Sequence, residues 1–114
     1  MAELINTDAG LRRLRGNKKL YCRMLRMFLA GGECDQLDAA LQAADAAAAA
    51  EAAHTVKGVA GNLSLDALFE TSTALMNELR AGAAAPSSAP AYRAALDSTK
   101  NAVRELVAQW EAES

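Results

Sequence analysis

Apolar residues recur at helical spacing along most of this chain, and short polar or glycine-containing breaks separate the runs. The clearest stripe combines positions i, i+3, i+4 and i+7, which is typical of one helix face, at Tyr21, Met24, Leu25 and Phe28. Asn17 is placed to cap this helix and Gly31-Gly32 to end it. A shorter helix, capped by Thr7 or Asp8 and ending at Gly16, should precede it after a loose lead-in over residues 1–6.

The rest of the chain continues in the same helical pattern. A third helix should begin near Asp35, and Asp45 should cap a long central helix over about residues 46–63. Another helix should follow the turn at residues 64–66 and end at Gly82. Residues 83–89 predict a loop, and Pro90 suits the first turn of a last helix. The inner face of that helix should carry Leu96, Thr99, Val103, Leu106, Val107 and Trp110.

These elements predict one all-α domain over residues 1–114. The four longest helices, joined mostly by short connections, favour an antiparallel up-and-down four-helix bundle with a short additional N-terminal helix. The composition agrees, because alanine, leucine and charged residues dominate and only five residues are aromatic.

Charge and cysteine content narrow the class of protein. The net charge is −2, but seven of the twelve Lys and Arg residues lie within residues 1–30. This basic cluster carries no nucleic-acid recognition motif, so we expect a solvated helix face or a surface for an acidic partner. Cys22 and Cys34 match no metal motif and should stay reduced. There is no secretory signal pattern and no apolar run of bilayer length, so we expect a cytoplasmic protein without membrane contact.

The only histidine lies on the outward face of the central helix. At about 100° per residue, one face of this helix gathers Ala49, Ala52, Val56, Val59, Ala60 and Leu63. The opposite face gathers His54, Lys57, Gly58 and Gly61, with Glu51 beside them. A lone histidine is commonly an ordinary surface residue. Each of the two glycines, however, costs about 1 kcal/mol of helix stability relative to alanine. A partner that approaches the helix closely would explain both, because it needs the absence of a β-carbon.

The segment His54-Thr55-Val56-Lys57-Gly58-Val59-Ala60-Gly61-Asn62-Leu63 resembles the signature of histidine-containing phosphotransfer domains, roughly H-x-[LIV]-K-G-x-x-x-N-[LI]-G. The opening helices are similar as well. One residue departs from the pattern: Ser64 stands where the family usually has glycine. Because this position follows the helix end, where a left-handed residue favours glycine, the departure concerns the local turn more than the chemistry.

The resemblance implies a phosphorelay intermediate. His54, through Nε2, would accept a phosphoryl group from a receiver-domain aspartate and pass it to another receiver aspartate. Lys57 would contact the phosphoryl oxygens, while Gly58, Gly61, Glu51 and Asn62 would form the docking face for the receiver. The expected partners are response-regulator receivers and a hybrid sensor histidine kinase. The chain itself, expected to be monomeric, would need no cofactor or metal, because the receiver would supply Mg²⁺.

Three other functions compete with this interpretation. An autophosphorylating kinase is disfavoured, because the H-E-[LI]-R-x-P context and the ATP-binding motifs do not occur in the sequence. The phosphoacceptor domain of a chemotaxis-type kinase stays open, although Asn62-Leu63 fits the relay domains better. A non-catalytic helical binding module also stays open, but it leaves Gly58 and Gly61 unexplained.

Overall fold

The computed structural model describes residues 3–83 and 85–113, and within them no strand is present. Six helices account for most of this part of the chain: α1 (Thr7–Arg13), α2 (Lys18–Ala30), α3 (Glu33–Gln42), α4 (Ala46–Asn62), α5 (Asp66–Arg80) and α6 (Ala89–Glu113). The prediction of an all-α protein is therefore confirmed. Of these helices, none is both long and apolar enough to span a bilayer.

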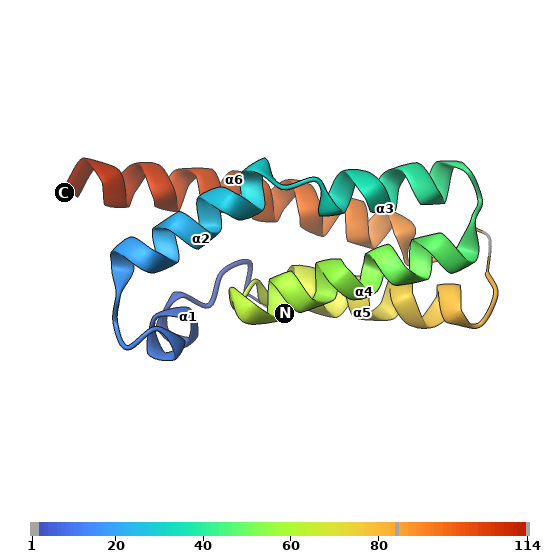
Figure 1. The fold of residues 1–114 in the computed structure, drawn as a ribbon, viewed down its shortest axis with the longest axis horizontal. Coiled ribbons are helices and arrows are strands. Elements are labelled where there is room, and N and C mark those ends of the chain that lie inside the picture. Colours follow the sequence, from blue (N-terminus) through green and yellow to red (C-terminus); the bar gives the residue numbers. More distant parts are fainter. Residues whose placement is uncertain (1–2, 84, 114) are drawn as a thin grey trace.

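The helices form an elongated body of 46 × 22 × 20 Å (Figure 1). Successive helices from α3 to α6 run in alternating directions along its length, and α2 runs ahead of α3 in the same direction. α4 packs against both α3 and α5, while α6 packs against α5 and α2. The central helix α4 thus lies between two helical neighbours and keeps its remaining side open.

Side chains cap the helices largely where the sequence predicts. Asn17 accepts a hydrogen bond from the Leu20 amide at 3.0 Å, and Asp45 accepts one from the Ala48 amide at 3.1 Å. The prediction for α1 was wrong by a residue or two, because Asn6 caps it, accepting from the Ala9 amide. The helix α3 begins two residues before the predicted start. The predicted loop over 83–89 separates α5 from α6, with residue 84 outside the described part.

Residues 3–6 of the lead-in to α1 differ from the prediction of a loose segment, and residues 1–2 lie outside the described part. The Asn6 amide donates to the Ser64 carbonyl at 2.8 Å, and the Ala67 amide donates to the Glu3 carbonyl at 2.9 Å. Backbone groups of the α4–α5 turn are therefore satisfied by the N-terminal segment. No sequence pattern indicates this pairing, because both segments are irregular and lie about 60 residues apart. The pairing fixes α1 beside the C-terminal end of α4.

The buried stripe of α4 is narrow and made mostly of alanine. It consists of Ala49, Ala53, Val56 and Ala60, all at most 1% exposed. The helical wheel did not single out Ala53, whereas Ala52 and Val59, which it placed inward, are half-buried. Small side chains let neighbouring helices approach closely, so the alanine face of α4 packs tightly while the opposite face is exposed to solvent.

The turn after α4 holds Ser64 in a left-handed backbone conformation. Ser64 has φ +57° and the Leu65 amide donates to the Ala60 carbonyl at 2.9 Å, which is the geometry of a Schellman helix end. The backbone here takes the left-handed conformation that favours glycine, yet the chain forms it with serine. The departure from the family pattern leaves this turn intact.

Candidate functional site

His54 lies exposed on α4, on the side opposite the buried alanine stripe. The position of the His54 side chain is set by the backbone of α4 and not by contacts of its imidazole ring. Lys57 follows three residues later and is half-buried, so the two side chains are surface neighbours on one helix face. The arrangement presents an imidazole to solvent with a cation one turn away.

The two glycines of this face have different surroundings. A β-carbon at Gly58 would meet no other atom of the described chain within 4 Å beyond its immediate helix neighbourhood. A β-carbon at Gly61 would lie 3.4 Å from Cδ2 and Cε2 of the Phe69 ring. Gly58 is therefore open to an incoming partner. At Gly61 the nearest neighbour is a side chain of the same protein.

A hollow of about 450 Å³ runs along α4 beside His54. Residues of α1, α4, α5 and the α4–α5 turn line it: Ala9, Arg13, His54, Lys57, Gly58, Gly61, Asn62, Ser64, Asp66 and Phe69. The hollow thus brings together five of the six predicted site residues. Glu51 is the exception: it is exposed one turn before His54 and lines no part of the hollow.

Sequence reasoning missed Phe69 as a site residue. The Lys57 ammonium lies over its ring, with Nζ 5.7 Å from the ring centroid, which is within the range of a cation–π contact. Phe69 is a large apolar residue, yet it is 38% exposed. Its spacing along α5 gave no signal of contact with α4.

Arg13 is the second residue that the sequence did not assign to the site. It comes from α1, which the N-terminal pairing holds beside the end of α4. Its charge also acts on Tyr21, the buried tyrosine whose hydroxyl donates to the Leu63 carbonyl. Burial, and then the negative charge of Asp66, raise the pKa of Tyr21 to about 12, and Arg13 opposes this rise. Two basic residues therefore line the hollow, Lys57 of α4 and Arg13 of α1.

A family model for the Hpt domain matches residues 23–113, which is most of the chain. The chain belongs to the Hpt domain family. Comparison with curated proteins gave no match, and neither did comparison with solved structures. Hpt domains are histidine phosphotransfer modules of two-component phosphorelay signalling. They interact with the receiver domains of response regulators and carry no kinase or ATP-binding domain of their own.

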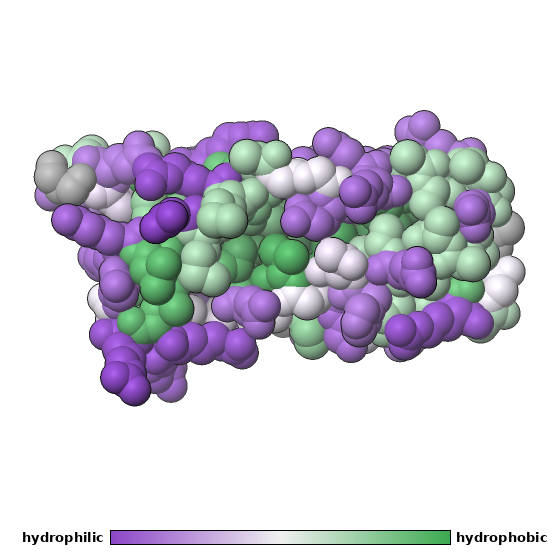
Figure 2. Space-filling view, in the orientation of Figure 1, coloured by the Kyte–Doolittle hydropathy of each residue, from purple (hydrophilic) through white to green (hydrophobic). Residues whose placement is uncertain are grey.

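A second hollow of this Hpt domain, lined mainly by apolar residues, lies on the other side of the His54 face. It also measures about 450 Å³ and is lined by Met24, Met27, Phe28, Val59 and Asn62 among others. Figure 2 shows apolar residues gathered where α2 meets α4, on a surface with many hydrophilic residues around them. Met27 is 65% exposed. Asn62 lines both hollows, so they flank the open crest of α4 on its two sides.

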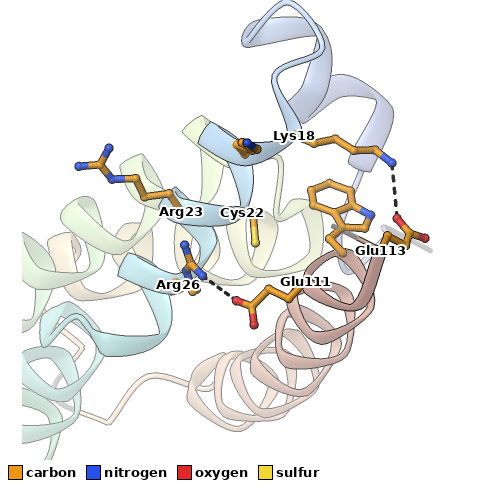
Figure 3. A pocket seen from close by; sticks show the side chains of 8 residues that line it. Lys18, Cys22, Arg23, Arg26, Glu111 and Glu113 are labelled. Carbon is orange, nitrogen blue, oxygen red and sulfur yellow. Dashed lines mark hydrogen bonds and ion pairs between the residues drawn. The ribbon is translucent and has the colours of Figure 1, made fainter.

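Another pocket, of about 610 Å³, lies between α2 and the C-terminal end of α6 (Figure 3). It contains part of the basic cluster. Arg26 pairs with Glu111 at 2.6 Å, and Lys18 approaches Glu113 at 3.9 Å. At these two positions, the basic face therefore pairs with acidic residues of the protein's own last helix. His54 does not line this pocket.

Cys22 and Cys34 are both buried free thiols. In the described part of the chain, no three His, Cys, Asp or Glu side chains cluster closely enough to hold a metal ion.

Proposed function

We propose that His54 is the phosphoacceptor of this Hpt domain, taking a phosphoryl group from one receiver aspartate and passing it to another. The observation that carries the proposal is the combination on α4: an exposed imidazole, a lysine three residues on and an open glycine four residues on, all on one helix face. The match to the Hpt family model supports histidine phosphotransfer as the type of reaction.

Phosphoryl transfer to His54 needs little covalent participation by other groups of the protein. A nitrogen lone pair of His54 forms the N–P bond while the acyl O–P bond of the receiver breaks and the aspartate carboxylate leaves. Transfer of this kind depends on in-line approach and neutralisation of charge on the phosphoryl oxygens. Lys57 supplies one positive charge from this chain. Mg²⁺ and the acidic pocket belong to the receiver in this proposal, so Hpt binding brings the two halves of the site together.

The docking face follows from the open side of α4. Gly58 allows the receiver backbone to approach His54, and Asn62 continues the crest toward the end of the helix. Gly61 lies beneath the Phe69 ring, and Glu51 extends the face at its other end. On the α2 side, the exposed Met27 and the apolar hollow beside it would pack against the receiver.

Several finer features belong to the same proposal. The alternating directions of α3 to α6 support the up-and-down four-helix bundle, with α2 preceding α3 and α1 as the short additional helix. The protein would act in the cytoplasm as a monomer between the receiver of a hybrid sensor kinase and a response regulator. Arg13 of α1 lines the hollow beside His54, and its positive charge favours the encounter with an acidic receiver site.

One experiment tests the function. A panel of receiver domains is phosphorylated with a radiolabelled small-molecule donor, purified from the donor and mixed with the protein. We expect label to move to this chain as an adduct stable in alkali and lost in acid, and then to leave on addition of a second, unlabelled receiver. If label reaches the chain from none of the receivers, the protein is not a relay and a binding role replaces the proposal.

A further inference from the structure

Phe69 lies where an exposed aromatic ring has no evident role in the core. It comes from the first turn of α5, is 38% exposed, and faces the strip of α4 that carries Lys57 and Gly61. Lys57 and Gly61 are one helical turn apart, so a single ring can cover both. The Lys57 ammonium lies 5.7 Å from the ring centroid, and the ring edge lies over Gly61.

The ring restricts where the Lys57 ammonium can be. A lysine side chain on a helix surface has several rotatable bonds and loses conformational entropy when it must take one position. A cation over an aromatic face is attracted by the negative potential of that face. The contact with Phe69 therefore favours lysine conformers that keep Nζ at the rim of the hollow beside His54.

The Phe69 ring limits the size of the side chain at residue 61. An alanine there would bring its β-carbon to 3.4 Å from two ring atoms, which is ordinary contact. A larger side chain would need the space that the ring occupies and would push it away from Lys57. Of the two glycines, only Gly58 is then explained by close approach of a partner alone.

We propose that Phe69 is a positioning residue for phosphotransfer: its ring holds the Lys57 ammonium beside His54, and Gly61 leaves the space in which the ring lies. The role rests on the proposed function of His54. Phe69 contacts Lys57 and acts through it.

A double-mutant cycle separates this role from direct contact with the receiver. Transfer rates from a phosphorylated receiver are measured for wild type, Phe69→Leu, Lys57→Ala and the double variant. Phe69→Leu keeps an apolar side chain but removes the ring, and should slow transfer about two- to fivefold, the range of an exposed cation–π contact. In the Lys57→Ala background the same change should have no further effect, and Phe69→Tyr should retain the wild-type rate. Equal slowing in both backgrounds would overturn the proposal and assign Phe69 to receiver binding.

A spectroscopic readout needs no receiver. In protein with ¹³C-labelled lysine, the ε-methylene resonance of Lys57 should be shifted upfield by the ring current and should lose this shift in Phe69→Leu. Lys18 is an internal control, because its Nζ lies 5.2 Å from the centroid of the Trp110 ring and its shift should persist. Gly61→Leu should also remove the Lys57 shift, whereas Gly58→Leu should leave it unchanged.

The two measurements fail independently. Absence of the upfield shift in the wild-type protein would overturn the positioning role even if transfer through His54 proceeds. Absence of any transfer would remove the proposed function, while a persistent Phe69-dependent shift would still show that the ring holds Lys57. Loss of the Lys57 shift in Gly58→Leu but not in Gly61→Leu would contradict the explanation of Gly61.

Discussion

The absence of a β-carbon at Gly58 lowers the stability of α4 but keeps the surface beside His54 accessible. Glycine in a helix interior is less stable than alanine by roughly 0.5–1 kcal/mol, because its backbone loses more conformational freedom on folding. No other part of the described chain lies near enough to require this glycine. The residue therefore weakens α4 slightly and keeps the surface beside His54 clear.

We predict that Gly58→Ala raises the free energy of unfolding by up to about 1 kcal/mol and lowers the transfer rate. The new methyl group would occupy the surface that the receiver approaches. Urea unfolding and receiver-to-protein transfer are measured on the same preparation. Asn77→Ala, at an exposed position of α5, is the matched control and should add stability without slowing transfer. A Gly58→Ala protein that transfers at the wild-type rate would contradict the docking face.

Lys57 is the one basic side chain placed on the same helix turn as His54. Removing a charge-assisted contact is worth about 1.5–3 kcal/mol when the contact is fully made in the transition state. Lys57→Ala should therefore slow transfer by about one to two decades without abolishing it. Lys57→Arg keeps the charge and should retain more of the rate. Single-turnover kinetics that do not differ between wild type and Lys57→Ala would show that Lys57 is only a solvated surface residue.

At the scale of single elements, α4 packs closely against its neighbours on one face and exposes His54 on the other. Its alanine stripe packs closely against its neighbours, and its C-terminal end is closed by the Ser64 turn. That turn also receives the hydrogen bond from Asn6, so the α4 terminus is tied to α1. The backbone at Ser64 is the strained point of this attachment, since its φ of +57° suits glycine better than serine.

Ser64→Gly should therefore stabilise the protein, by about 1 kcal/mol, through relief of the left-handed conformation. Ala44, at the end of α3, has φ +54° and is exposed, so Ala44→Gly serves as a comparison that should gain a similar amount. Thermal unfolding of the two variants gives the sizes. Destabilisation by Ser64→Gly would mean that its buried side chain contributes more than the strain removes.

Features of the helices that depend on neighbouring residues could be predicted from the sequence. Local signals gave the caps at Asn17 and Asp45, the helical phase of His54 and Lys57, and the left-handed position at Ser64. Contacts between distant segments had no local signal. Phe69 and Arg13 reach the site from other helices, and the pairing of residues 3–6 with the α4–α5 turn depends on backbone groups that any sequence carries.

For the whole molecule, Tyr21 joins three parts of the fold to the end of the site helix. Its hydroxyl donates to the Leu63 carbonyl at the end of α4, its ring lies 5.8 Å from the Trp110 ring of α6, and it packs against Gly10 of α1. A carbonyl at a helix end has no partner within the helix, so this bond satisfies a buried acceptor. The closeness of α1 to the ring also requires glycine at residue 10.

Tyr21→Phe should lower the free energy of unfolding at neutral pH by about 1–3 kcal/mol, because it leaves the Leu63 carbonyl without its donor. Its pKa gives a second signature. Folding raises the pKa from 10.0 to about 12, so the folded state favours the neutral phenol. The contribution of Tyr21 is therefore fully present below pH 10 and is lost as the pH rises from 10 to 12.

Urea unfolding between pH 9 and 12 measures this loss. The wild-type protein should lose stability more steeply than Tyr21→Phe over this interval, although the pKa of Tyr92 is also raised by burial and acts in the same direction in both proteins. Parallel pH profiles for the two proteins would show that the Tyr21 hydroxyl is not held neutral by the fold.

Transfer from a phosphorylated receiver to wild type and to His54→Gln, side by side, tests the central claim that the phosphoryl group passes through His54. Because the ring is exposed and supports no buried packing, His54→Gln should keep the helical circular dichroism and thermal stability of the wild type. Wild type should gain an acid-labile phosphoryl group, and the variant should gain none. A folded His54→Gln protein that still accepts phosphate from the receiver would contradict the assignment.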